Sequence, residues 1–372
     1  MASTGILSTD LESRLAERTL QLIDIASESD AERNIAEHVL DVLSDGGVPV
    51  RDAGDTCVLA GATSRSDRPL VLLAGHLDTV PAQDNWPGKR TREHVEGLGA
   101  SDMKGGVAVM LELALALARA SVGVDGGAPD GGSVDVGYVL FGREELPAAH
   151  GALGALLACE PGPRGADLAI MLEPTANAVQ AGCLGNLDAT WTFNGRAGHS
   201  ARPWLADNAI DHAVGGIQAL HAIGPSLITI DGLAFTQVVS ATTLHAGVAR
   251  NVIPGTATAS VNFRYSPDLA AEQAERTLRG WCEPHGEIEV LSNSPGALPP
   301  HENPLLDRLV AASGGSIEAK QAWTPVAEFA AVGVEAVNFG PGDPAFAHRP
   351  DERIATEALV RCYRILEAFL CA

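Results

Sequence analysis

Basic residues are scarce in this chain, which has 25 lysines and arginines against 47 aspartates and glutamates, a formal net charge of −22. Nucleic-acid binding needs clustered lysine and arginine, so this composition argues against a nucleic-acid partner. The six cysteines are scattered and form no C-x-x-C pair, which predicts reduced thiols in a cytoplasmic protein. A metal site would therefore have to use histidine and carboxylate ligands.

Long hydrophobic runs are also missing. The longest apolar stretch, around residues 107–120, is interrupted by Glu112 and Arg119 and is too short to span a bilayer. Residues 1–10 have no basic segment followed by an apolar one, so we expect no secretory signal and no membrane association. The length of 372 residues, with 46% hydrophobic and 19% charged residues, predicts a globular enzyme of two domains.

The first part of the chain alternates apolar strands with helices. We expect strands at 69–74, 134–141 and 166–172, helices at 10–25, 30–43, 102–120 and 148–159, and a surface loop at 121–133. The pattern resumes near the end, with a strand at 335–339 and a helix at 354–370. This alternation is typical of an α/β domain with a mostly parallel central sheet.

The pattern changes after Gly185. Strands are expected at 187–194, 236–245, 256–264 and 287–291, with helices at 207–223 and 267–281. The first of these strands alternates apolar and polar residues, which indicates a half-exposed sheet in a small α+β unit. We therefore predict one α/β domain, made of residues 1–184 and 296–372, interrupted by a smaller α+β domain of residues 185–295.

Histidines and acidic residues follow the carboxyl ends of the expected strands. They are His76, Asp78, Glu144, Glu145, Glu173 and His348, while Asp102 opens the helix after the first strand, where the helix dipole favours negative charge. In an open parallel sheet such groups converge on one crevice. Two histidines and three carboxylates suit a pair of zinc ions bridged by one carboxylate.

Taken singly, each residue has an ordinary interpretation. His76 could be a structural histidine, Glu144 and Glu145 a solvated turn, and Asp102 a helix cap. Their common placement at strand ends makes a joint coincidence a poor explanation. Asp78 can hydrogen-bond the second nitrogen of His76. Glu144 and Glu145 could hardly both stay ionised without a metal, so we expect one ligand and one general base.

Several motifs resemble a known family of dinuclear zinc amidohydrolases. They are Gly75–Pro81 (GHLDTVP), Ser101–Gly106 (SDMKGG), Glu144-Glu145, Glu173–Thr175 (EPT) and the late His348. The family includes succinyl-diaminopimelate desuccinylase, acetylornithine deacetylase, carboxypeptidase G and the aminoacylases. The resemblance covers nearly the whole chain. It implies a zinc-peptidase-like catalytic domain, two zinc ions for which cobalt could substitute, and a homodimer formed through the inserted lid domain.

The resemblance also implies a role for each residue. Asp102 would bridge the two metals, with a cis peptide bond to Met103. The remaining metal ligands would be His76 and Glu173 at one site, and Glu145 and His348 at the other. Glu144 would be the general base and Asp78 would orient His76.

In the lid domain, His199 would reach the active site of the partner subunit and stabilise the oxyanion, although a surface histidine in a Gly-Ser turn is the alternative. The implied substrate-binding residues are Arg202, Asn251, Arg264 and Gly342. Arg250 and Arg349 are further cations that could pair with substrate carboxylates.

Three segments, 181–186, 196–202 and 338–343, look like the actinobacterial desuccinylase branch of this family. That branch implies hydrolysis of N-succinyl-LL-2,6-diaminopimelate to succinate and LL-diaminopimelate, a step of lysine biosynthesis. The sequence departs from the branch in one segment, where Pro325 replaces an aspartate and Glu328 an arginine. If this segment lines the pocket, one end of that substrate would lose its partner and meet a like charge.

Three hypotheses therefore stay open. The chain is a desuccinylase of N-succinyl amino acids, or a deacylase or dipeptidase for a different N-acyl amino acid or peptide in a specialised pathway, or a non-hydrolytic lyase or binding protein on the same metal scaffold. Retention of Glu144 and of all the ligands argues against a role in binding alone.

Overall fold

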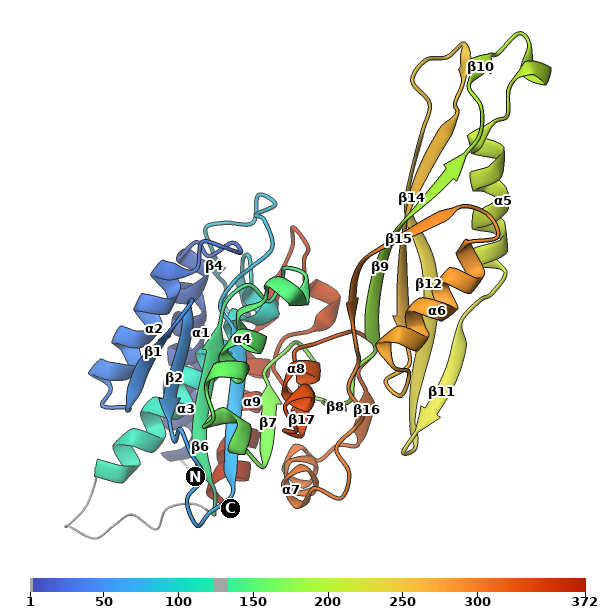
Figure 1. Cartoon of the computed structure of the whole chain (residues 1–372). Coiled ribbons are helices and arrows are strands. Elements are labelled where there is room, and N and C mark those ends of the chain that lie inside the picture. Colours follow the sequence, from blue (N-terminus) through green and yellow to red (C-terminus); the bar gives the residue numbers. More distant parts are fainter. Residues whose placement is uncertain (1–2, 123–132) are drawn as a thin grey trace. The chain divides into compact units, whose positions relative to one another are not determined.

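The computed structural model describes residues 3–122 and 133–372. The loop expected at 121–133 lies mostly outside these residues. The chain divides into two compact units (Figure 1). Unit 1 consists of Met1–Ala181, Pro299–Glu318 and Glu328–Ala372, and unit 2 of Gly182–Leu298 and Ala319–Ala327.

Unit 1 is built on an eight-stranded sheet in the order β1-β2-β6-β3-β7-β17-β8-β16. The strands are β1 (Val50–Gly54), β2 (Cys57–Gly61), β3 (Leu70–His76), β6 (Asp135–Phe141), β7 (Leu168–Met171), β8 (Val179–Ala181), β16 (Ile317–Ala319) and β17 (Ala336–Asn338). The four central strands, β6, β3, β7 and β17, are parallel. Every residue of β3 is buried, as expected for an apolar strand covered on both faces. The mostly parallel central sheet is therefore confirmed.

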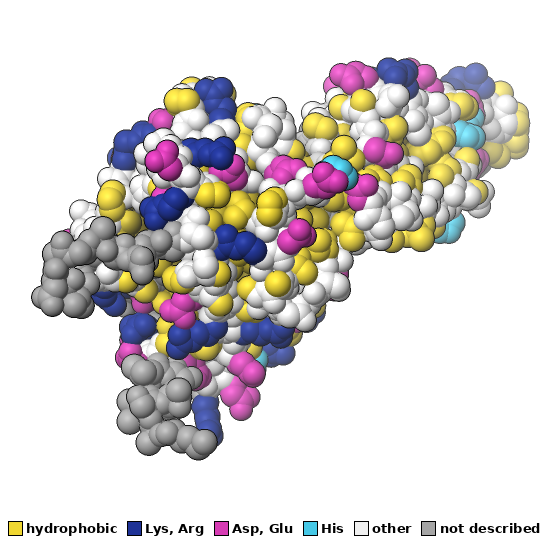
Figure 2. Space-filling model, turned by 90° about the horizontal axis from the view of Figure 1, so that it is seen from below, with side chains coloured by type: hydrophobic (Ala, Val, Ile, Leu, Met, Phe, Trp, Pro, Cys, Tyr) yellow, Lys and Arg dark blue, Asp and Glu magenta, His cyan; other side chains and the backbone are white. Residues whose placement is uncertain are grey.

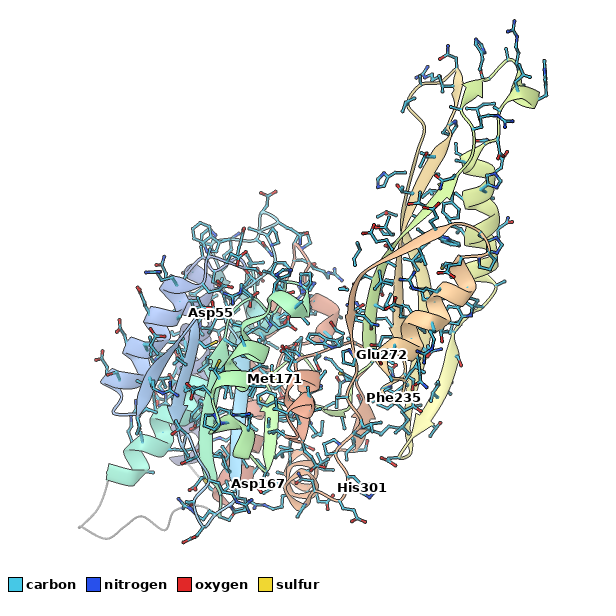
Figure 3. All side chains as sticks on the ribbon, viewed as in Figure 1. Asp55, Asp167, Met171, Phe235, Glu272 and His301 are labelled. Atoms are coloured by element: carbon cyan, nitrogen blue, oxygen red, sulfur yellow. The ribbon has the colours of Figure 1, made fainter. Side chains whose placement is uncertain are left out.

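The parallel direction brings the carboxyl ends of the central strands to the same edge of the sheet. Figure 3 shows this direction in β7: Asp167, just before the strand, and Met171, its last residue, lie at opposite ends. Side chains that follow β3, β6, β7 and β17 in the sequence are therefore delivered to one edge.

Helices pack on this sheet and against one another. They are α1 (Ser3–Asp24), α2 (Arg33–Asp45), α3 (Gly105–Val122), α4 (Ala152–Cys159), α7 (Pro304–Ser313), α8 (Val326–Ala331) and α9 (Thr356–Cys371). α1, α3 and α9 contact each other, and all residues from Gly105 to Leu115 in α3 are buried. A helix that is apolar around its circumference is expected at such a central position. None of the described helices combines the length and apolarity needed to cross a bilayer.

The helix expected to open at Asp102 begins later. Residues Ala100–Lys104 form a short irregular turn, η1, in which Asp102 has a non-helical backbone (φ −124°, ψ 95°), and α3 starts at Gly105. The prediction that Asp102 opens a helix was therefore wrong, because its backbone is extended. The argument from the helix dipole fails with it, since the first turn of α3 contains no acidic residue.

Unit 2 contains a five-stranded antiparallel sheet in the order β11-β12-β14-β9-β15. The strands are β9 (Gly185–Asn194), β11 (Ser226–Ile230), β12 (Leu233–Ala246), β14 (Thr256–Tyr265) and β15 (Glu287–Ser294), and the helices are α5 (Ala209–His221) and α6 (Ala271–Cys282). Burial alternates along β9 and β14, so that one face of the sheet, including Trp191 and Phe263, packs into the core with α5 and α6. The expected half-exposed α+β sheet is confirmed.

Three strands of unit 2 were missed, of which β11 is the longest. β11 pairs with β12 in a hairpin closed by Asp231 and Gly232, both with positive φ (48° and 80°). An Asp-Gly pair between two apolar runs is a strong hairpin signal, so the sequence did contain the evidence. A shorter pair, β10 (Gly198–His199) with β13 (Val252–Ile253), lies in the same unit.

Acidic and basic side chains are interspersed over the face of the molecule shown in Figure 2, with hydrophobic side chains among them. Neither the acidic nor the basic side chains form a single continuous patch on this face.

Candidate metal centre

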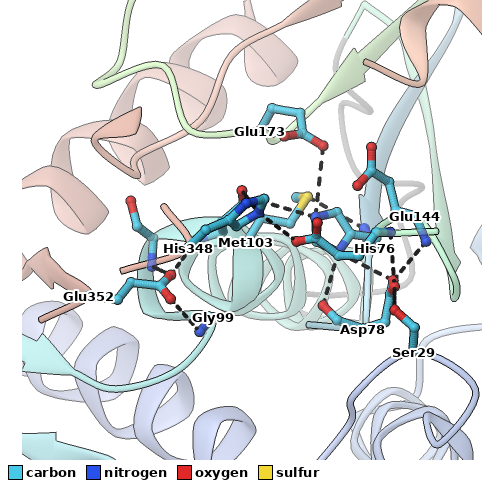
Figure 4. Close-up of polar contacts among 12 residues, drawn as sticks. Ser29, His76, Asp78, Gly99, Met103, Glu144, Glu173, His348 and Glu352 are labelled. Atoms are coloured by element: carbon cyan, nitrogen blue, oxygen red, sulfur yellow. Dashed lines mark hydrogen bonds and ion pairs between the residues drawn. The ribbon is translucent and has the colours of Figure 1, made fainter. Parts of the chain in front are cut away.

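The candidate ligands of unit 1 come from separate segments and meet at the carboxyl edge of the central sheet (Figure 4). His76 is the last residue of β3, Glu145 follows β6, and Glu173 follows β7. Asp102 lies in η1, and His348 lies in the segment after β17. The structure thus brings together all five residues for which the sequence predicted metal binding.

These five side chains form two groups that share one member. In the first, Nε2 of His76 lies 3.2 Å from Oδ1 of Asp102 and 3.9 Å from Oε1 of Glu173. In the second, Nε2 of His348 lies 3.0 Å from Oε1 of Glu145 and 3.4 Å from Oδ2 of Asp102. Within each group the potential ligand atoms lie within 4.8 Å of one another. Asp102 therefore directs one carboxylate oxygen to each group.

The donor set fits two divalent cations. Each group offers one imidazole nitrogen and carboxylate oxygens, a ligand combination that zinc accepts readily, and a shared carboxylate is a natural bridge between two ions. His76, Asp102 and Glu173 would hold one ion, and Asp102, Glu145 and His348 the other. A carboxylate oxygen of Glu144 also lies within 4.8 Å of potential ligand atoms of His76 and Glu145. Glu144 therefore lies beside the proposed ions.

The pKa values show how strongly these groups interact. Burial would lower the pKa of His76, yet its hydrogen bonds to Asp102 and Asp78 raise it well above the usual value. The hydrogen bonds of His348 to Asp102 and Glu145 raise its pKa to about 11. Both histidines thus act as cations for the surrounding carboxylates. Bound metal cations would take over this role, because a metal ligand must be deprotonated.

Glu144 differs electrostatically from its neighbour. Burial raises the pKa of Glu144 well above its usual value, and the charge of Glu173 adds to the effect. A carboxyl group held so close to other acids binds a proton readily. This is the property that a general base and acid requires.

Asp78 is fully buried and holds the segment that carries both glutamates. Its carboxylate accepts hydrogen bonds from the backbone N–H groups of Glu144 and Glu145, each at 3.0 Å, and from the Ser29 hydroxyl at 2.7 Å. Nδ1 of His76 lies 3.1 Å from the backbone oxygen of Asp78 and 3.5 Å from its carboxylate. Asp78 therefore fixes His76 largely through its main chain, while its side chain positions the next ligand segment.

Two residues of this network were absent from the sequence-based predictions. Ser29 hydrogen-bonds Asp78, and Glu352, four residues after His348, hydrogen-bonds the backbone around Asp102. Ser29 gave no signal, because an isolated serine in a polar segment is common. Glu352 could have been noticed as an acid close in sequence to a predicted ligand.

The predicted substrate residues of unit 1 have local structural roles. A Cβ atom added to Gly342 would lie 2.2 Å from the backbone oxygen of Ser101, so only glycine permits this close approach to η1. Arg349 forms an ion pair with Asp351 at 2.8 Å. The Asp102–Met103 peptide bond is cis, as the resemblance implied.

The remaining predicted site residues lie in unit 2. His199 and Asn251 are brought together where β10 pairs with β13: the backbone oxygen of Asn251 accepts a hydrogen bond from Ser200, next to His199. Nδ1 of His199 accepts a hydrogen bond of 3.0 Å from the backbone of Ala201. Arg202 is exposed, whereas Arg264 is half-buried on β14 and donates to Asn262 at 3.0 Å.

The segment that departs from the desuccinylase branch is well packed. Pro325 is buried, and the carboxyl group of Glu328 accepts a hydrogen bond from the backbone of Gly154 in the first turn of α4. A Cβ atom on Gly154 would lie 2.8 Å from Oε1 of Glu328, so the glycine allows this contact. Burial raises the pKa of Glu328 to about 7.

Comparison with known proteins agrees with this geometry. Residues 72–372 match the model of peptidase family M20/M25/M40. A Mycobacterium tuberculosis protein that carries the name succinyl-diaminopimelate desuccinylase DapE is 38% identical over 97% of this chain and 99% of its own length. The succinyl-diaminopimelate desuccinylase of Corynebacterium glutamicum is 36% identical over 95% of both chains.

The fold is also similar to that of a solved structure, the YXEP protein of Bacillus subtilis, described as a dinuclear metal binding peptidase from the M20 family. It superposes with a TM-score of 0.69 at 16% sequence identity, and 98% of each chain is covered. The chain therefore belongs to peptidase family M20/M25/M40 and is a metal-dependent amidohydrolase.

Proposed function

We propose that the chain hydrolyses N-succinyl-LL-2,6-diaminopimelate to succinate and LL-diaminopimelate, with two zinc ions bound by His76, Asp102, Glu145, Glu173 and His348. The observation that carries this proposal is the position of Asp102 between two ligand groups. The full-length similarity to desuccinylases supports the choice of substrate. This activity would place the protein in lysine biosynthesis, and its cytoplasmic location stays a prediction from the sequence.

Zinc at these ligands would lower the pKa of a coordinated water and polarise the scissile carbonyl. Glu144 takes a proton from the attacking water, because it lies beside both ligand groups and its pKa is raised. The same carboxyl group then delivers the proton to the departing amine, so that the products are a carboxylate and a free amino acid. Asp78 keeps Glu144 in place through the backbone hydrogen bond of 3.0 Å.

His199 is proposed to donate a hydrogen bond to the oxyanion. Its Nδ1 accepts a hydrogen bond from Ala201, so the neutral imidazole carries its proton on Nε2. That leaves Nε2–H as the donor for a substrate oxygen. Arg202, Asn251 and Arg264 are proposed to bind the substrate, the arginines through its carboxylates.

The division into a catalytic domain, 1–184 and 296–372, and a lid and dimerisation domain, 185–295, is part of the same proposal. One edge of β12 pairs with β11, but only along Leu233–Gln237. Among the described residues, no strand pairs with the rest of this edge, from Val238 to Ala246. On α5, Ile210 and Val214 lie one turn apart and are 37% and 46% exposed. An open strand edge beside exposed apolar side chains suits a second copy of the same unit.

Dimerisation can be tested by light scattering with a matched pair of variants. Val214→Lys places a charge on the exposed face of α5 and should produce monomers. Leu291→Lys changes an equally apolar residue, 64% exposed on β15 at the other edge of the sheet, and should leave a dimer. A Val214→Lys protein that stays dimeric would contradict this interface.

One observation favours a second candidate, a deacylase for a different N-acyl amino acid or peptide. Pro325 and Glu328 replace the aspartate and arginine of the desuccinylase branch, so this segment lacks the cation with which that arginine could pair a substrate carboxylate. The two candidates share the metal centre and differ in the substrate.

The deciding experiment compares substrates on the zinc-loaded protein. Initial rates are measured with N-succinyl-LL-2,6-diaminopimelate, N-acetylornithine and a panel of N-acyl amino acids. The proposal predicts the highest kcat/KM for the succinylated substrate. A clear preference for another acyl group would favour the second candidate, and no hydrolysis of any substrate would contradict both.

A further inference from the structure

Glu352 is a buried acid outside the ligand set. Its side chain is 3% exposed and accepts three hydrogen bonds from backbone N–H groups. Oε2 binds Gly99 at 2.9 Å, while Oε1 binds Ser101 at 2.9 Å and Asp102 at 3.0 Å (Figure 4). A carboxyl group is costly to bury without partners, so three amide donors on one short segment indicate a specific fit.

The segment that Glu352 binds has little regular structure of its own. Asp102 has extended backbone angles within η1, so the i to i−4 hydrogen bonds of an α-helix do not hold its N–H group. That N–H group instead donates to Glu352. The direction of the Asp102 side chain, which must serve two ligand groups at once, therefore depends on this external contact.

Glu352 also belongs to the segment that carries the other ligand of the second group. It lies four residues after His348, and its own N–H donates to the backbone oxygen of Arg349 at 3.1 Å. Its backbone oxygen accepts a hydrogen bond from Gly97 at 3.0 Å. One residue thus joins the His348 segment to the Asp102 segment through both its main chain and its side chain.

We propose that Glu352 is a positioning residue of the metal centre. It holds the backbone of Asp102 at a fixed position relative to His348, so that both side chains reach the same ion. The inference rests on the dinuclear centre proposed above. Glu352 touches neither the ions nor the substrate in this scheme. It acts on metal affinity and on coordination geometry through Asp102.

Glu352→Gln is the direct test. Glutamine keeps the size of the side chain but replaces one acceptor oxygen with an NH₂ group, which would face a backbone N–H donor. The matched control is Asp135→Asn at the start of β6, the end of that strand away from Glu145. Asp135 is 8% exposed and, like Glu352, accepts a backbone hydrogen bond, from Ser66 at 3.3 Å.

The probe is cobalt(II), whose visible absorption reports ligand number and geometry, whereas zinc has no such spectrum. Stoichiometry, dissociation constants and spectra are measured for the wild type and both variants. Glu352→Gln should weaken binding of at least one ion by roughly 10- to 100-fold and change the cobalt spectrum, as loss of an outer-sphere partner does. Asp135→Asn should keep the affinity and spectrum of the wild type, whatever its Tm.

Unchanged cobalt affinity and spectrum in Glu352→Gln would overturn the proposal, and so would the same losses in Asp135→Asn. If Glu352→Gln does not fold, Glu352→Asp is measured in its place, because its shorter carboxylate cannot reach all three amides and the same losses are expected. A wild-type protein that binds no cobalt would refute the dinuclear centre itself. Two ions bound equally by the wild type and Glu352→Gln would refute this inference alone.

Discussion

Nε2 of His348 lies 3.4 Å from Oδ2 of Asp102, although the two residues are far apart in the sequence. The second oxygen of the same carboxylate faces His76 at 3.2 Å. One aspartate thus connects two histidines, one at the end of β3 and one in the segment after β17. This relationship makes a dinuclear metal centre a better explanation of the cluster than a set of surface ion pairs.

Replacement of the proposed general base should separate chemistry from metal binding. Glu144→Gln is expected to keep two metal ions, because the other ligands are intact, and to lose about 10²- to 10⁴-fold in kcat, as removal of a general base does. Glu302→Gln, at a side chain that is 86% exposed, is the control and should behave as the wild type. Metal content by elemental analysis and initial rates are the measurements. Full activity in Glu144→Gln would remove this residue from the mechanism.

Loss of His199 should lower the rate without loss of metal. His199→Ala removes the proposed oxyanion donor, so kcat should fall by about 10²- to 10³-fold while the metal content stays the same. His301→Ala, at a side chain that is 75% exposed, serves as the control and should retain both. A loss of metal in His199→Ala would show that this residue is a ligand.

A mixing experiment tests whether His199 serves the partner subunit. If the chain dimerises as proposed, co-expressed Glu144→Gln and His199→Ala chains would form mixed dimers in which one active site has an intact Glu144 and, from the other chain, an intact His199. Such a mixture should regain roughly a quarter of wild-type activity if the histidine acts across the dimer. A mixture that stays as inactive as its two components would place His199 in its own subunit's site.

Glu328 should make stability depend on pH. Its pKa is about 7 in the folded chain, because burial disfavours the charged form, against about 4.3 in an unfolded chain. Between these values the folded state binds more protons, so the free energy of unfolding falls as the pH rises from about 4 to 7. Glu328→Gln keeps an acceptor for Gly154 and removes the titration.

We therefore expect Glu328→Gln to gain stability relative to the wild type as the pH is raised from 5 to 8, on the order of 1 kcal/mol. Urea unfolding at both pH values measures this difference. The exposed variant Glu302→Gln should show no such trend. A stability difference that does not change with pH would mean that Glu328 is ionised throughout the range.

Much of the fold and of the ligand set could be predicted from the sequence. The apolar run Leu70–Ala74 predicts a buried strand, and the position of His76 just after it places the histidine at the edge of the sheet. The resemblance in motif order supplied the bridging role of Asp102. Strand ends and motifs are local features, and local features can be read from a single sequence.

The contacts that support the ligands could not be predicted in the same way. The extended backbone of Asp102 depends on its hydrogen bond to Glu352, which lies far along the chain. No local pattern in the sequence predicts this pairing. The Asp78 carboxylate binds Ser29 and two backbone amides, while proximity in sequence suggested only His76. Glu328 was expected to face substrate if its segment lined the pocket, whereas its hydrogen bond to Gly154 is a packing contact.

The central claim is that Asp102 is shared between two metal ions, and the number of ions bound per chain tests it most directly. Equilibrium dialysis against zinc, followed by elemental analysis, should give two ions for the wild type and one for Glu173→Gln, which loses a ligand of the first group only. Asp102→Asn should bind fewer than either, because one group receives an NH₂ group in place of a ligand oxygen and the other keeps only an uncharged amide oxygen. An Asp102→Asn protein that still binds two ions as tightly as the wild type would contradict the account.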